Sequence, residues 1–263
     1  MDIKKLNGKL EAGSTYLIKS TEYPNMSINI KSSGTKEKPI TIQAEGEVIL
    51  SSMSSLRITG DYIIFQGFHF QSIKKNKMIK LEGSHIRFTK NIINDLDKEV
   101  EQVIRVLGKH NRIDNNKILR MDKSGVIIQV VAEKDKPTYC LIDNNNFNGR
   151  KEQSKNGGEV IRIGDSKTHT FNCRCIVYGN NFNYCNADIE VVSVKSCENI
   201  IYNNRFIDCK GGLVLRHGNN NLVSYNYFNG EMAEDNPDAC GLRIMGKGHR
   251  VYFNTFLFCV KTL

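Results

Sequence analysis

Short apolar runs alternate with polar residues along the chain, and each run leads to an asparagine and a closing aromatic or aliphatic residue. The repeated copies are HIRFTKNII (85–93), HNRIDNNKI (110–118), YCLIDNNNF (139–147), CRCIVYGNNF (173–182), CENIIYNNRF (197–206), NNLVSYNYF (220–228) and GHRVYFNTF (248–256). An earlier copy, GDYIIFQGF (60–68), carries Gln66 in place of the asparagine. From Phe68 to Phe256 the closing residues are 25, 25, 29, 35, 24, 22 and 28 positions apart, which indicates one structural coil per step.

The residues of each repeat favour stacked strands over stacked helices. β-Branched residues prefer strands, while Asn and Gly supply the left-handed backbone of tight turns. Coils of this length predict an all-β fold, a single-stranded parallel β-helix, in which each coil adds about 4.8 Å and packs its apolar residues on the next. We expect one domain over residues 1–263, with the asparagines forming a hydrogen-bonded ladder and the closing phenylalanines stacked in the core.

Composition limits the class of protein without deciding it. Hydrophobic residues make up 40% and charged residues 25% of the 263 positions, which is typical of a globular domain. The net charge of +9 would attract a nucleic acid, an anionic membrane or an acidic glycan. No block of five like charges occurs, and the aromatic residues belong to the repeat, so we expect neither a nucleic-acid partner nor a membrane partner.

Two further features of composition concern compartment. The eight cysteines lie within strand-like runs and at turns, so we expect most of them to be buried small apolar residues and not disulfides or zinc ligands. The first ten residues lack an apolar core of the kind found in signal peptides, and no run of 18 apolar residues occurs. The compartment is left open.

Candidate chemistry falls on four segments that are about one coil apart. Alternation in Asp188-Ile189-Glu190 predicts that both carboxylates leave the same face of a strand. Arg162, Glu190, Arg216 and Arg243 are separated by 28, 26 and 27 residues, so we expect them to form one charged stripe. The stripe could be a solvated face with ordinary ion pairs. Alternatively, Asp188, Glu190 and an amide oxygen such as that of Asn156 would suit Ca²⁺.

The motifs in their order resemble one known family, the polysaccharide lyases of family 6, which include chondroitinase B and many alginate lyases. The segments that carry the resemblance span nearly the whole chain and are AGSTYLI, KPITIQA, SSLRITGDYIIFQGFHF, GKHNRI, NGGEVIRIG, EVVSVKSC, LVLRHGN and GLRIMG. The resemblance implies a right-handed parallel β-helix. It also implies calcium ligation by Asn156, Asp188 and Glu190, a catalytic base at Lys195 with Arg216 as its partner, and substrate binding by Arg162, His217 and Arg243.

The reaction that the resemblance implies is β-elimination on a uronate polymer, with an acidic polysaccharide as the partner. Lys195 would remove the C5 proton as a neutral amine, which nearby Ca²⁺ and Arg216 would favour. Calcium on the substrate carboxylate would stabilise the developing charge. We expect alginate or polymannuronate as the substrate; the alternatives are a chondroitin or dermatan sulfate lyase, or a weak or inactive glycan-binding β-helix.

Two departures from the family pattern bear on that choice. The family has Glu-x-Glu where this chain has Asp188-x-Glu190, whose first side chain is one methylene shorter. Family members continue for further coils, whereas this chain stops soon after Phe256, so we expect those coils to be absent and Phe256, Leu257 and Phe258 to be exposed. Such enzymes usually act in the periplasm or outside the cell.

Overall fold

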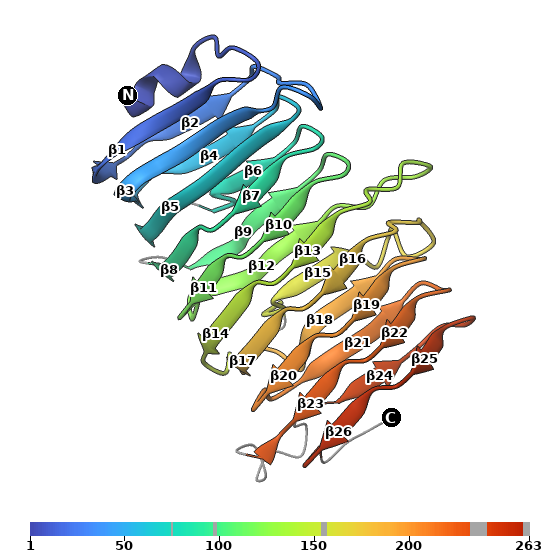
Figure 1. Cartoon of the computed structure of the whole chain (residues 1–263). Helices are drawn as coiled ribbons and strands as arrows, with labels where there is room; N and C mark the ends of the chain where they lie inside the picture. The colour runs from blue at the N-terminus through green and yellow to red at the C-terminus, as the bar shows by residue number, and fades with distance from the viewer. Residues whose placement is uncertain (75, 97–98, 154–156, 232–240, 260–263) are drawn as a thin grey trace.

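A computed structural model describes residues 1–74, 76–96, 99–153, 157–231 and 241–259 of the chain (Figure 1). The predicted all-β, right-handed parallel β-helix is confirmed, with strands of successive coils stacked from the N-terminus to the C-terminus. Within those residues, no helix is both long enough and apolar enough to cross a membrane.

One face of the β-helix is a nine-stranded parallel sheet, counted over the described residues. We call it the nine-stranded sheet, and it contains β2 (Ser27–Ile30), β4 (Ser55–Ile58), β6 (Ile79–Leu81), β9 (Val100–Val106), β12 (Ser124–Val130), β15 (Ile161–Gly164), β18 (Glu190–Lys195), β21 (Gly212–His217) and β24 (Leu242–Ile244).

The other two faces begin as three long strands and then separate. The long strands are β1 (Thr15–Pro24), β3 (Ile40–Ser52) and β5 (Ile63–Ile73). One column continues as β7 (Arg87–Thr89), β10 (Arg112–Asp114), β13 (Leu141–Asp143), β16 (Ile176–Tyr178), β19 (Ile200–Tyr202), β22 (Leu222–Ser224) and β25 (Arg250–Tyr252). The other continues as β8 (Ile92–Leu96), β11 (Lys117–Leu119), β14 (Asn146–Arg150), β17 (Asn181–Cys185), β20 (Arg205–Ile207), β23 (Tyr227–Asn229) and β26 (Thr255–Leu257).

The predicted asparagine ladder runs along the turns between these two columns. The side-chain oxygen of Asn91 accepts from the backbone N–H of Phe68, and that of every later member accepts from the backbone N–H and the amide of the asparagine one coil earlier. Its members are Asn91, Asn116, Asn145, Asn180, Asn204, Asn226 and Asn254. This arrangement satisfies backbone groups that would otherwise be buried without partners.

The predicted core stack is also confirmed from Phe147 onward. Ring centroids of Phe147, Phe182, Phe206, Phe228 and Phe256 follow one another at 5.0, 4.7, 4.6 and 4.8 Å. Parallel register aligns these rings because each is the second residue of its strand.

The expected alignment of the first copy was wrong. Ile93 pairs with Phe70 and not with Phe68, and Gln66 pairs with Thr89 and donates its amide to Gln43 at 2.9 Å. The long strand β5 has no asparagine turn here, so the repeat is displaced by two residues.

Cysteines behave largely as expected. Cys140, Cys173, Cys175, Cys185, Cys197 and Cys209 are buried free thiols.

The two ends of the described solenoid differ. The 3₁₀ helix η1 (Ile3–Asn7) covers the first coil and buries Ile3 and Leu6. At the other end, Leu257 and Phe258 are 41% and 57% exposed, as predicted, whereas Phe256 packs partly buried against the core.

Candidate functional site

Lys195, Glu190 and Arg216 meet at the C-terminal part of the nine-stranded sheet. Lys195 ends β18, and its ammonium nitrogen lies 3.7 Å from a carboxylate oxygen of Glu190. The guanidinium Nε of Arg216, on the adjacent β21, lies 3.4 Å from the other oxygen of Glu190. Three of the residues expected to carry chemistry are therefore in direct contact.

Asp188 is held beside this group by backbone hydrogen bonds. Its carboxylate accepts from the N–H groups of Gly157 and Gly158 at 3.0 and 3.1 Å, and from that of Glu190 at 3.0 Å. Gly157 has φ +103°, and a Cβ on Gly158 would lie 2.9 Å from Ala187, so this turn needs both glycines. The predicted ligand Asn156, which precedes this turn, lies outside the described residues.

A buried cation anchors the same turn. Arg150 is 2% exposed, and its guanidinium donates to the carbonyl oxygens of Gly158, Ser124 and Gly125. Burial lowers the pKa of Arg150 to about 10. The guanidinium therefore ties the glycine turn that holds Asp188 to the preceding coil.

Glu159 has a position in the site that the sequence did not reveal. It is 3% exposed, and its Oε1 lies 3.2 Å from the Lys195 ammonium and 3.4 Å from the Arg162 guanidinium. Its Oε2 is buried without a hydrogen-bond partner. Arg162 also donates from Nε to Gln129, a second residue that was not anticipated. Glu159 belongs to the NGGEVIRIG motif, and that motif is the feature of the sequence from which its place in the site could have been predicted.

The expected single stripe of Arg162, Glu190, Arg216 and Arg243 was wrong. Arg162 and Arg243 share one column of the nine-stranded sheet, separated by Ser193 and Val214. Glu190 lies three residues before Ser193 on β18, and Arg216 lies two residues after Val214 on β21, so both are outside that column. The paired positions Arg162, Ser193, Val214 and Arg243 are 31, 21 and 29 residues apart, so the near-equal spacings read from the sequence did not correspond to one line of side chains.

His217 lies opposite Lys195 in the register of β18 and β21. Burial lowers the pKa of His217, and the charges of Arg216, His169 and Lys195 lower it further, against an opposing effect of Glu190. The neutral imidazole is accordingly favoured in this position. Its ring is tilted against that of His169, with centroids 5.9 Å apart.

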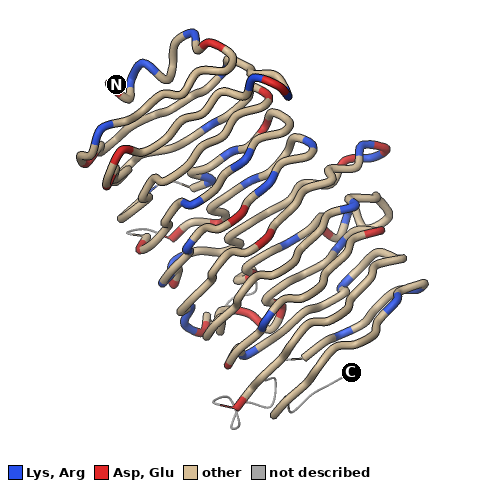
Figure 2. The backbone as a smooth tube through the Cα atoms, viewed as in Figure 1, with Lys and Arg blue, Asp and Glu red and all other residues tan. Residues whose placement is uncertain are grey.

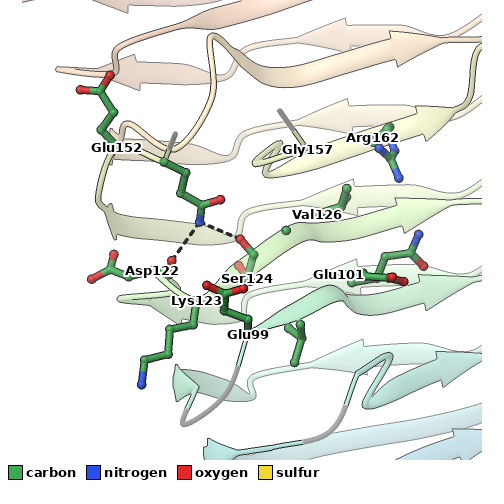
Figure 3. Close-up of a pocket in the computed structure, with 13 residues that line it drawn as sticks. Glu99, Glu101, Asp122, Lys123, Ser124, Val126, Glu152, Gly157 and Arg162 are labelled. Atoms are coloured by element: carbon green, nitrogen blue, oxygen red, sulfur yellow. Dashed lines mark hydrogen bonds between the residues drawn. The ribbon is translucent and has the colours of Figure 1, made fainter. Parts of the chain in front are cut away.

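A cavity of about 730 Å³ extends from Arg162 and Gly157 over the preceding coils (Figure 3). Its other walls include the carboxylates of Glu99, Glu101 and Asp122. The space beside the charged cluster is thus acidic along one side.

The metal site expected at Asp188 and Glu190 stays a prediction. Among the described residues, no group of three or more His, Cys, Asp and Glu side chains is arranged to hold a metal ion. The two carboxylates nonetheless supply the hard oxygen donors that Ca²⁺ prefers.

Comparisons with known proteins agree with this architecture. The sequence model of the family described as chondroitinase B matches residues 2–262. The structure of the PL6 family alginate lyase AlyGC is similar with a TM-score of 0.89 and 29% identity, covering 96% of this chain and 36% of that one. A mannuronic acid specific family 6 lyase from human gut microbiota gives a TM-score of 0.88 and 32% identity, covering 96% and 61%. No curated protein sequence gave a match. The chain spans less than two thirds of these two proteins.

Proposed function

Because the chain belongs to the chondroitinase B family, we propose that it is a polysaccharide lyase that cleaves an acidic uronate polymer by β-elimination. The observation that carries the proposal is the contact of Lys195 and Arg216 with one carboxylate, that of Glu190. Alginate or polymannuronate is the proposed substrate. Its support is the similarity to an alginate lyase and to a mannuronic acid specific lyase.

Each residue would have a separate part in the elimination. Lys195, as the free amine, takes the C5 proton of the uronate, and the electrons of the C5–H bond form the C4–C5 double bond. The C4–O4 bond breaks, and O4 leaves with its electron pair and takes a proton from water, which Lys195 replaces when it gives up the proton taken from C5. Arg216, whose side chain is 44% exposed, faces solvent where it can stabilise negative charge on the substrate. Arg162, His217 and Arg243 are the proposed substrate contacts.

We also propose Ca²⁺ as the cofactor, held by Asp188 and Glu190 together with Asn156. The donor chemistry fits, because each carboxylate oxygen has more than one lone pair and the backbone contacts of Asp188 use only part of them. When bound, the ion would stabilise negative charge that develops on the substrate carboxylate.

Absorbance of the unsaturated uronate product tests the lyase proposal. We expect cleavage of polymannuronate that is lost in Lys195→Ala and retained in Lys109→Ala, a variant of an exposed lysine away from the site. Parallel digests of polyguluronate and dermatan sulfate would decide among the uronate polymers. Failure to cleave any of the three would contradict the proposal.

The calcium proposal has a test that does not depend on turnover. In the Lys195→Ala background, added Ca²⁺ should raise the thermal midpoint, since an ion that binds only the folded state stabilises it. Asp188→Ala in the same background should abolish the rise. An equal rise in both variants would show that calcium binds elsewhere.

A glycan-binding protein without turnover is the second candidate. The observation that favours it is Asp188: the side chain is shorter than the glutamate of the family pattern, and both of its oxygens accept backbone hydrogen bonds. Retention of polymannuronate by the chain with no change in polymer length would identify this function.

A further inference from the structure

Three cations occupy directly opposed positions on the N-terminal strands of the nine-stranded sheet. Arg57 on β4 pairs in register with Lys80 on β6, which pairs with Arg105 on β9. We call these three residues the basic column. Each step between paired strands is about 4.8 Å. Figure 2 shows basic residues on successive coils of this half of the molecule.

Among the described residues, the basic column has fewer carboxylate partners than cations. Like charges directly opposite one another destabilise a sheet. The side chain of Glu82 pairs with Arg57 at 2.7 Å, and the pKa of Glu82 is lowered mainly by that bond and further by Lys80 and Arg105. Arg105 donates to the neutral Gln102 at 3.0 Å. Among the residues that the structure describes, one carboxylate thus serves three cations, and an anion from outside would relieve the remaining repulsion.

The column is accessible and leads into the charged cluster. The Arg57 side chain is 50% exposed, and Lys80 and Arg105 are half-buried. The register continues from Arg105 through Gln129 to Arg162, whose guanidinium contacts Glu159. Four steps separate Arg57 from Arg162, which corresponds to about 19 Å along the axis.

We propose that the basic column binds the part of an anionic polysaccharide that extends from the reacting bond toward the N-terminal coils. A uronate polymer carries one carboxylate on each sugar, so successive sugars can place their charges beside successive cations. Glu99, Glu101 and Asp122 line the neighbouring cavity together with Lys123, and their carboxylates disfavour an anionic chain there relative to the column. The inference rests on the proposed function, of which it defines a remote binding region.

The test measures binding in the Lys195→Ala chain, which should not consume the ligand. Polymannuronate of about 20 sugars and a mannuronate trisaccharide are titrated against this chain and against the same chain carrying Lys80→Ala and Arg105→Ala. We expect the long polymer to bind about tenfold more weakly to the column variant, with a smaller dependence on salt, and the trisaccharide to bind equally. Lys109→Ala with Lys117→Ala is the control, since it removes the same charge from exposed positions outside the nine-stranded sheet.

The outcomes separate this inference from the lyase proposal. Equal affinity of the long polymer for the column variant and the charge-matched control would overturn the inference, even if the unmodified chain is an active lyase. Loss of affinity confined to the column variant would support it, even if no polymer is cleaved. A variant that loses affinity for duplex DNA but keeps its affinity for polymannuronate would also overturn it. Lys80→Gln with Arg105→Gln repeats the measurement if the alanine variant has a lowered thermal midpoint.

Discussion

At the scale of single residues, Glu159 connects the proposed base to a proposed substrate contact. Its Oε1 is shared by Lys195 and Arg162, at 3.2 and 3.4 Å. The buried carboxylate of Glu159 therefore holds the Lys195 ammonium and the Arg162 guanidinium in place. Glu159 is therefore a positioning residue, acting through Lys195 and Arg162.

Replacing Glu159 by glutamine keeps its shape and removes its charge. We expect kcat to fall by about tenfold or more while KM changes by less than about threefold, because the amine is misplaced relative to C5. The pH profile of kcat should also shift, which a purely structural role would not cause. Initial rates by absorbance provide the measurement, with Glu133→Gln as the control from an exposed ion pair with Lys136. Unaltered kcat in Glu159→Gln would remove Glu159 from the mechanism.

His110, although exposed, should make the stability of the solenoid depend on pH. Its ring stacks between those of His85 and Tyr139, with centroids 4.9 Å apart on both sides. Burial lowers the pKa of His110, and the charges of His85 and Lys109 add to this effect. The folded chain then binds fewer protons than the unfolded chain. The contribution of His110 to the free energy of unfolding is complete above its pKa in the unfolded chain, about 6.5, and is lost as the pH falls below that pKa.

His110→Tyr tests that direction because it retains a flat ring and removes the titrating group. Between pH 8 and pH 5 we expect the thermal midpoint of the unmodified chain to fall further than that of His110→Tyr. Circular dichroism melts at several pH values give the comparison. Identical declines in the two chains would assign the acid sensitivity to other groups.

The residue scale also shows what the sequence could supply about the site. Coil length brought Glu190 and Arg216 together and the family resemblance added Lys195 as the base; Glu190 contacts both of the other two. Coil length could not identify Glu159, because spacing does not tell which acidic side chain turns into the protein. Glu159 and Lys195 are brought together by the pairing of β15 with β18 on successive coils. Residues close to either one in the sequence do not reveal that contact.

At the scale of elements, the asparagine ladder joins the coils at their turns. The Asn180 side-chain oxygen accepts both the backbone N–H and the amide of Asn145, and its own amide donates to the Ile142 carbonyl at 2.9 Å. Asn180→Ala leaves these buried groups without partners, at about 1–3 kcal/mol for each. We expect the free energy of unfolding to fall by about 3 kcal/mol or more.

Urea unfolding measures that loss as a lower midpoint. Asn181→Ala is the matched control, because the neighbouring Asn181 is exposed and its replacement should change stability by less than about 0.5 kcal/mol. Similar midpoints for the two variants would mean that the ladder contributes little to stability.

The strands could be predicted from the sequence because each coil repeats the residues of this ladder. The register between coils could be predicted only in part. The asparagines of the ladder and the stacked phenylalanines recur in the sequence because every coil repeats one set of contacts. The shifts in β18–β21 and the uninterrupted β5 leave no such mark, since they depend on how neighbouring coils meet. The Phe68 alignment failed at β5, and the stripe failed because the coils between Arg162 and Arg243 differ in length.

At the scale of the whole molecule, the solenoid presents an apolar surface on its last described coil. Val251, Tyr252, Phe253, Leu257 and Phe258 are 39%, 42%, 69%, 41% and 57% exposed. They belong to or adjoin β25 and β26, whose outer edges have no strand paired with them among the described residues. Exposed apolar edge strands promote pairing between molecules.

The 263-residue polypeptide should therefore associate as its concentration rises. Phe253→Lys combined with Leu257→Lys should keep it monomeric, since charges on an edge strand oppose pairing. The control pair Met53→Lys and Tyr184→Lys replaces apolar side chains that are 49% and 47% exposed elsewhere and should leave association intact. Sedimentation velocity over a hundredfold range of concentration distinguishes these cases. If the unmodified chain stays monomeric throughout, or if both pairs abolish association equally, the last coil is not the surface through which molecules meet.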